Sequence, residues 1–150
     1  MNLIDVANIA GNIQLANAPV FLIAGVGALL NVLTNRLARV VDRWRTLERE
    51  VDDAPDGPAR EAAKAELVGL DLRMIRINRA ILLSTIAVLL VCVVIVILFM
   101  GEIIHADLAL PIAILFIAAM IALIFALVSF LGEIAVATRF LRVGHAYRRK

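Results

Sequence analysis

Three long segments without charged residues constrain the fold more than any other feature of this sequence. Residues 6–35, 80–101 and 108–132 contain no Asp, Glu, Lys or Arg, and these segments are 30, 22 and 25 residues long. An α-helix needs about 20 apolar residues to cross the hydrocarbon core of a bilayer. The composition agrees, because 63% of the 150 residues are hydrophobic, whereas soluble domains contain about 45–50%. The sequence therefore predicts an all-α membrane protein with three transmembrane helices.

The first uncharged segment is longer than one span requires. As a single helix its 30 residues would extend roughly 45 Å, whereas the hydrocarbon core is roughly 30 Å thick. We therefore predict a break near Gly11 and Asn12, with an outer segment at residues 1–12 and the first span at residues 13–35. The second span is predicted at residues 80–101 and the third at residues 108–132.

The positions of the basic residues indicate the orientation of the spans. Residues 1–12 and 102–107 contain no Lys or Arg, whereas residues 36–79 contain ten and the tail at residues 133–150 contains five. Lys and Arg near the ends of spans remain on the cytoplasmic side. We therefore predict that the N-terminus and the loop at residues 102–107 lie outside, and that the C-terminal tail is cytoplasmic.

The charged segment between the first two spans has the pattern of two paired helices. Apolar residues recur at alternating steps of three and four, which is the spacing of a coiled-coil seam. Pro55 and Pro58 lie between the two halves, where they end one helix and suit the start of the next. We predict a cytoplasmic αα-hairpin at residues 36–79 that extends spans one and two, either as a solvated packing element or as a docking surface for a cytoplasmic protein. The seam residues are Leu37, Val40, Trp44, Leu47 and Val51, then Ala63, Leu67, Leu70, Met74, Ile77 and Ile81.

Small and amide side chains form a second seam along span one, which we call the amide face. Its members are Asn17, Phe21, Ala24, Ala28, Asn31, Asn35, Ala38 and Asp42. An amide without a partner in hydrocarbon costs several kcal/mol, so this face should contact protein or water and not lipid. A similar stripe in span three consists of Ala119, Ala122, Ala126, Ser129 and Glu133. Because three helices cannot cover all of these faces, we predict that the protein associates with copies of itself.

Polar residues also gather where the spans meet the cytoplasm. These residues are Asn31, Thr34, Asn35, Arg36, Arg39, Asn78, Arg79, Glu133 and Arg139. A carboxylate at this depth is costly unless it is paired, so we expect Glu133 to form an ion pair with Arg36 or Arg79. The cluster has two interpretations. It either fastens the three helices by hydrogen bonds or contributes to a hydrated ion path.

In the ion-path interpretation, the amide face would surround the axis of an oligomer. Asn17, Asn31, Thr34 and Asn35 would line the pore, and Arg36 or Arg39 would surround its cytoplasmic mouth. Glu102 and Asp107 would lie at the outer entrance. The two mouths would then have opposite charge and favour opposite ions, so the pattern does not assign an ion selectivity.

Other functional classes lack the residues that they need. Cys92 is the only cysteine, which excludes an intramolecular disulfide and a cysteine-built zinc or iron–sulfur site on one chain. We find no nucleophile paired with a base, no phosphate-binding glycine loop and no metal-ligand spacing. The basic residues flank apolar segments and do not form a stripe suited to nucleic acid. We therefore expect no catalytic residue, no cofactor, no bound metal and no nucleic-acid partner.

Three stretches resemble a bacterial membrane-protein family catalogued as domain of unknown function 2721. They are IQLANAPVFLIAGVGALLNVLTNRLARVVDR at residues 13–43, INRAI at residues 77–81 and FIAAMIALIFALVSFLGEIAVAT at residues 116–138. The most specific parts are residues 31–36, Asn78 with Arg79, and Glu133. The resemblance implies a multi-pass protein of the bacterial inner membrane, and it implies no activity, substrate or cofactor.

Two functional hypotheses follow from these observations. In the first, the protein is a homo-oligomeric channel or pore lined by the amide face of span one. In the alternative, it is a non-conducting membrane scaffold or regulatory subunit whose cytoplasmic hairpin binds a partner protein. An enzymatic function is not expected.

Overall fold

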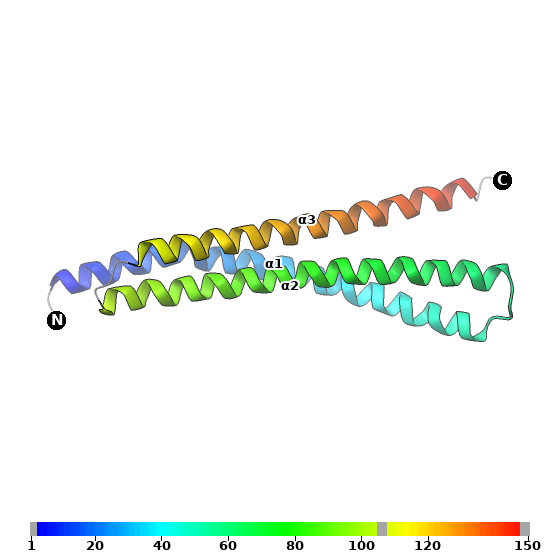
Figure 1. Cartoon of the computed structure of the whole chain (residues 1–150), viewed down its shortest axis with the longest axis horizontal. Coiled ribbons are helices and arrows are strands. Elements are labelled where there is room, and N and C mark those ends of the chain that lie inside the picture. The colour runs from blue at the N-terminus through cyan, green and yellow to red at the C-terminus, as the bar shows by residue number, and fades with distance from the viewer. Residues whose placement is uncertain (1–2, 105–107, 148–150) are drawn as a thin grey trace. The chain divides into compact units, whose positions relative to one another are not determined.

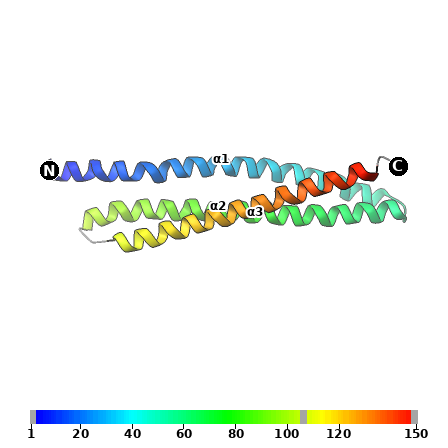
Figure 2. The ribbon, with the colours of Figure 1, turned by 90° about the horizontal axis from the view of Figure 1, so that it is seen from above.

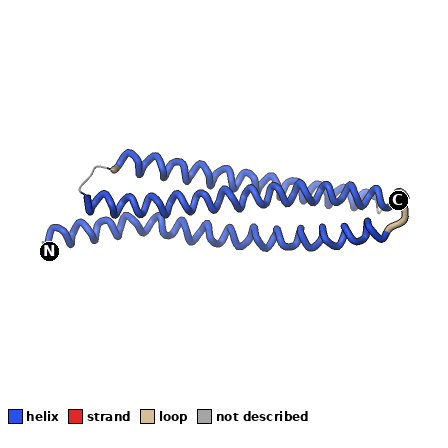
Figure 3. The backbone as a smooth tube through the Cα atoms, turned by 60° about the horizontal axis from the view of Figure 1, so that its bottom comes forward, coloured by secondary structure: helices blue, strands red, loops and turns tan. Residues whose placement is uncertain are grey.

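The computed structural model consists of three long helices. They are α1 (Leu3–Asp53), α2 (Pro58–Ile104) and α3 (Ala109–Tyr147), and Figure 1 shows them along the chain. The structure describes the backbone of residues 3–104 and 108–147, and the side chains of residue 17 and of residues 19–101, 103–104 and 108–134. Within these limits every residue is helical except 54–57 and 108 (Figure 3). The prediction of an all-α chain is confirmed for the described residues.

Each helix contains a stretch that is long and apolar enough to cross a membrane. The three stretches are Pro19–Asp53, Pro58–Gly101 and Ala109–Ile134. Large apolar side chains remain exposed along them, including Phe21 at 77%, Leu89 at 62% and Leu110 at 71%. In water such surfaces would favour aggregation, whereas lipid tails solvate them. These helices are those of a multi-pass membrane protein.

Helix α1 differs from the prediction near its start. We expected a break at Gly11 and Asn12, but α1 is continuous from Leu3 to Asp53. Gly and Asn lower helix propensity by about 1 kcal/mol or less, and both keep the backbone N–H that a helix needs. Pro19 does lack this donor, and α1 accommodates it within the helix. The prediction of the break was therefore wrong, and the boundary between the outer segment and span one stays a prediction.

The connection between α1 and α2 is short because its residues favour helix ends. Pro58 is the first residue of α2, where its missing N–H costs no hydrogen bond. The N–H of Glu61 donates to the carbonyl of Gly57 at 3.2 Å and closes the first turn. The Glu61 carboxylate in this turn also suits the positive end of the helix dipole.

The described residues form two compact units, each with a segment of all three helices. The first unit contains α1 up to residue 30, α2 from residue 83 and α3 up to residue 124. Its core consists of small and β-branched side chains at steps of three and four: Val26, Ser84, Ala87, Val91, Val94 and Ala119. Small side chains let helix backbones approach closely, which is the usual packing in membranes.

The second unit contains α1 from residue 31, α2 up to residue 82 and α3 from residue 125. Most of its buried residues recur at intervals of seven, as in a coiled coil: Leu33, Val40 and Leu47 on α1, Leu70 and Ile77 on α2, and Ala126 and Glu133 on α3, while Val51 and Ala80 are also buried. Within this unit the segments of α1 and α2 lie side by side in opposite directions on either side of residues 54–57 (Figure 2). Arg43 on α1 bonds the Glu66 carboxylate on α2 at 3.1 and 3.3 Å.

Candidate functional site

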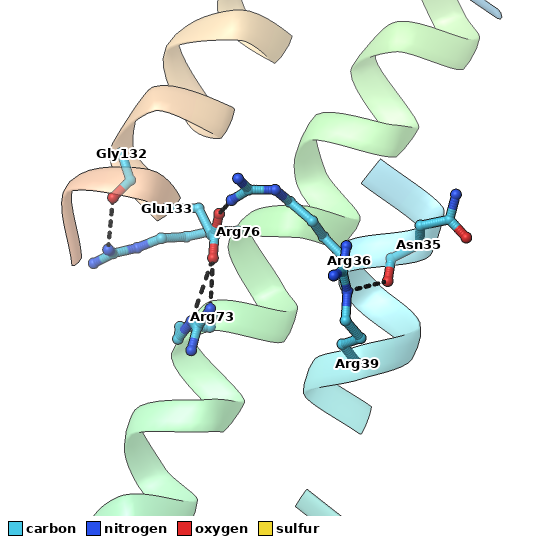
Figure 4. Close-up of polar contacts among 7 residues, drawn as sticks. All are labelled: Asn35, Arg36, Arg39, Arg73, Arg76, Gly132 and Glu133. Carbon is cyan, nitrogen blue, oxygen red and sulfur yellow. Dashed lines mark hydrogen bonds and ion pairs between the residues drawn. The ribbon is translucent and has the colours of Figure 1, made fainter. Parts of the chain in front are cut away.

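The second unit contains a fully buried carboxylate, Glu133, bonded by two arginines. Nη1 of Arg36 on α1 donates to Glu133 Oε2 at 2.8 Å. Nη2 and Nε of Arg73 on α2 donate to Oε1 at 2.9 and 3.3 Å. Figure 4 shows both guanidinium groups directed at the carboxylate of α3. The three residues therefore join the three helices of this unit through one carboxyl group.

The burial of Glu133 explains why it needs two partners. Its side chain is 0% exposed, whereas those of Arg36 and Arg73 are 35% and 27% exposed. Removing a carboxylate from water costs several kcal/mol, which a close ion pair with additional hydrogen bonds can offset. The guanidinium carbon of Arg36 also lies 5.2 Å from the centre of the Phe130 ring, within the range of a cation–π interaction. The group as a whole has one negative and two positive charges.

Two further arginines bond to backbone carbonyls near this group. Nη1 of Arg76 donates to the carbonyl of Gly132 at 3.5 Å. Nε of Arg39 donates to the carbonyl of Asn35 at 3.4 Å. Figure 4 shows Arg76 reaching α3 while Arg39 stays beside its own helix. Both side chains therefore add positive charge near Glu133 and its two arginine partners. These two bonds are to neutral carbonyl groups and not to carboxylates.

The predicted pairing of Glu133 is confirmed for Arg36 and not for Arg79. Arg79 is exposed, and in the described part of the chain the second partner of Glu133 is Arg73. The cause is helical phase, because Arg73 follows the buried Leu70 by three positions and precedes the buried Ile77 by four. Arg79 comes two positions after Ile77 and projects from another side of α2. The apolar seam of α2 was a signal that could have identified Arg73.

The predicted amide residues lie apart from Glu133. Asn31, Thr34 and Asn35 are exposed on α1, where Nδ2 of Asn35 donates to Oδ1 of Asn31 at 3.1 Å and Oγ1 of Thr34 donates to the carbonyl of Asn31 at 3.0 Å. Asn78 is exposed on α2, and Asn17 is exposed on α1 in the first unit. The structure thus brings Arg36 to Glu133 and leaves the predicted amides on helix surfaces.

Three predicted site residues fall outside what the structure describes. Arg139 belongs to α3 and Glu102 to α2, but their side chains are beyond the described part. Asp107 lies outside the described residues altogether. The predicted outer mouth at Glu102 and Asp107 stays a prediction.

The two seams of small residues have different surroundings. On α3, Ala119 is buried in the first unit and Ala126 in the second, while Ser129 donates to the carbonyl of Phe125 at 2.8 Å. On α1, every member of the amide face from Asn17 to Asp42 is exposed. The α3 stripe therefore packs within the chain, whereas no part of the described chain covers the amide face.

The described residues contain no group of three or more His, Cys, Asp or Glu side chains that could hold a metal ion. The site of the second unit is instead rich in arginine, which binds carboxylates and phosphates through a planar fork of N–H donors. The contacts of this site are ion pairs with Glu133 and hydrogen bonds to carbonyl oxygens.

Comparison with known proteins identifies a family. No curated protein and no solved structure matches the chain. A family model described as a protein of unknown function (DUF2721) matches residues 16–143. The match includes Arg36, Arg73 and Glu133 and extends over most of the 150 residues. The chain therefore belongs to the DUF2721 family.

Proposed function

We propose that the protein is a homo-oligomeric, non-enzymatic membrane protein whose subunits meet through the amide face of α1. The exposure of this face is the observation that supports the proposal. Asn17, Asn31 and Asn35 are all exposed on a helix long and apolar enough to cross a membrane. The Asn31–Asn35 bond uses one of the four amide donors of these two side chains. In hydrocarbon the other donors need protein or water.

The proposed orientation puts the N-terminus outside and the C-terminus in the cytoplasm of the bacterial inner membrane. The absence of Lys and Arg from residues 1–12 and 102–107 supports this orientation. Residues 36–79 then form a cytoplasmic helical hairpin. The partners of the protein are the lipid bilayer and further copies of the chain, and nucleic acid is not among them.

We further propose that the assembled α1 helices line an ion path. A ring of amide side chains supplies both donors and acceptors, which can replace part of the hydration shell of an ion. Arg36 is bonded to Glu133, so Arg39, which is exposed on α1, is the arginine at the cytoplasmic mouth. In this arrangement Arg36 has a structural role and not a pore-lining one.

Self-association is tested first, by enlarging one alanine of the amide face. Ala28→Phe should reduce the oligomer mass of the purified protein in detergent, measured by light scattering coupled to size-exclusion chromatography. Ala113→Phe is the matched control, because Ala113 is also an exposed alanine, on α3 of the same unit. A monomeric wild type, or the same loss of mass in both variants, would contradict the proposed interface.

Conduction is tested separately in liposomes with imposed ion gradients. Asn31→Leu should change the flux of small ions while the oligomer mass stays constant. Asn78→Leu removes an exposed amide from α2 and should leave the flux unchanged. Intact assemblies without flux under any gradient would remove the channel function and leave the non-conducting scaffold, with the hairpin at residues 36–79 as its binding surface for a partner protein.

A further inference from the structure

Four arginines of the second unit line one cavity. Its volume is about 310 Å³, and it lies between α1 and α2. Arg36, Arg39 and Arg43 line it from α1 and Arg73 lines it from α2, while Val40 and Leu70 complete the wall. Arg36, Arg39 and Arg43 are spaced by three and four residues, which puts them along one side of the helix. Figure 4 shows three of the four, each with a polar partner.

Positive charge around this cavity exceeds the negative charge that neutralises it. Arg36 and Arg73 share the single charge of Glu133. Arg43 pairs with Glu66 at 3.0 Å and lies 3.8 Å from Glu50. Arg39 bonds the neutral carbonyl of Asn35. Four guanidinium groups thus have two carboxylates, Glu133 and Glu66, as close ion-pair partners. The third carboxylate, Glu50, lies near the upper limit of the ion-pair distance.

The arginines keep the means to bind a further anion. A guanidinium group has five N–H donors, whereas the bond of Arg36 to Glu133 uses one nitrogen atom, Nη1. The side chains of Arg36, Arg43 and Arg73 are 35%, 48% and 27% exposed, so an ion can reach them. Holding four like charges around one cavity is costly, and an anion with several oxygens would reduce that cost.

We propose that this cavity is a binding site for a phosphate group, which we call the four-arginine site. A phosphate has several charged oxygen atoms, so it can accept bidentate bonds from more than one guanidinium. Val40 and Leu70 give the cavity an apolar side that suits the ester end of a phosphate ester. The site needs no second copy of the chain, because one chain supplies all six lining residues.

The phosphate group has two sources, a lipid headgroup and a soluble ion. Arg36 directly follows the uncharged segment that ends at residue 35, and Arg73 precedes the uncharged segment at residues 80–101 by seven positions. The Arg36 end of the site therefore lies beside a predicted span, near the depth at which the phosphates of lipid headgroups are found. A soluble phosphate would reach the same arginines from the aqueous side.

The experiment uses the full chain in a phosphate-free detergent and two probes. The first probe is inorganic phosphate, titrated against the thermal unfolding midpoint at constant ionic strength with chloride as the reference anion. The second probe is short-chain phosphatidylglycerol, with binding measured by native mass spectrometry. At least one probe should bind saturably to the wild type, which identifies the source.

Arg39→Gln is the diagnostic variant, because Arg39 bonds a backbone carbonyl and its replacement leaves the Glu133 and Glu66 ion pairs intact. It should weaken binding about tenfold, since hydrogen bonds to charged groups are worth about that factor or more. Arg45→Gln removes the same charge from an exposed position of α1 that does not line the cavity, and it should bind like the wild type.

Arg43→Gln provides a second variant from the cavity wall and should also weaken binding. If neither probe binds saturably, the four-arginine site is not a phosphate site. The same conclusion follows if Arg39→Gln and Arg45→Gln weaken binding equally, because the effect is then that of net charge alone. Each variant should have the same thermal unfolding midpoint as the wild type when no probe is present. A difference in binding between the variants is then not caused by a difference in folding.

Discussion

Glu133 is fully buried, and loss of its carboxylate should destabilise the second unit. Glu133→Gln removes the carboxylate. The guanidinium groups of Arg36 and Arg73 then lie near each other without the negative charge that neutralises them. Breaking a buried ion pair costs about 3–5 kcal/mol when the remaining charge is buried, and the loss here should be smaller because the Arg36 and Arg73 side chains are 35% and 27% exposed. We expect a lower unfolding midpoint in detergent, measured by circular dichroism.

Glu48→Gln is the control for this prediction, because Glu48 is an exposed carboxylate of the same unit. Surface changes of this kind usually alter stability by about 0.5 kcal/mol or less. If the two variants unfold at the same temperature, the Glu133 pairs contribute nothing to stability.

The choice between Arg73 and Arg79 gives a second prediction at the residue scale. Arg73→Gln should destabilise the protein because it leaves one oxygen of a buried carboxylate without its partner. Arg79→Gln should have little effect, since Arg79 is exposed. The double variant Arg73→Gln with Glu133→Gln should lose less unfolding free energy than the two single variants lose together, by about 0.5–3 kcal/mol. Additive effects, or equal effects of the two arginine changes, would show that Arg73 is not the partner.

The sequence predicted part of this site because an unpaired carboxylate in a membrane is energetically costly. It missed the other part because the prediction did not consider on which side of α2 each arginine lies. A carboxylate at the end of an apolar segment must be paired, which identified Glu133 and one of its partners, Arg36. Proximity to the end of a span favoured Arg79 as the other candidate. The partner is instead Arg73, which lies farther from the span but on the buried side of α2. Position along a helix and position around it are separate quantities, and the prediction used only the first.

The packing of α1 against α2 in the second unit depends on residues spaced by seven. Leu47 is 2% exposed in this seam, whereas Leu72, on α2 of the same unit, is 52% exposed. Leu47→Ala should lower the free energy of unfolding by about 2–5 kcal/mol, because it leaves a cavity. Leu72→Ala deletes the same atoms from an exposed position and should cost far less. Chemical denaturation in detergent measures both, and similar losses would place Leu47 outside the core.

At the scale of elements, apolar periodicity correctly predicted buried positions of the helices. The start of α2 was also predicted, whereas the expected break in α1 was wrong. Val40, Leu47, Leu70 and Ile77 belong to the predicted seams and are buried, because one face of each helix must leave the solvent. The start of α2 at Pro58 follows from the missing N–H of proline. The expected break at Gly11 and Asn12 was wrong, because weak helix propensity does not end a helix whose backbone donors and acceptors can all be satisfied within it.

At the scale of the whole molecule, the charges predict an orientation that the fold alone does not contain. Three membrane-capable helices are compatible with either direction of insertion, and the distinction comes from Lys and Arg in the connecting segments. Residues 36–79 contain 19 of the 28 charged residues. The predicted orientation therefore depends on the sequence between the spans, and it can be measured without reference to helix packing.

Site-directed labelling tests this orientation in intact cells. In a Cys92→Ser background, which removes the one native thiol, a single cysteine replaces Ile103 or Lys64. Both positions are exposed, near the end of α2 and near its start. A membrane-impermeant maleimide applied to spheroplasts should label Ile103→Cys directly and Lys64→Cys only after permeabilisation, because the proposed orientation keeps the basic segment in the cytoplasm. The reverse pattern would invert the topology, and labelling of both from outside would mean that α2 does not cross the membrane.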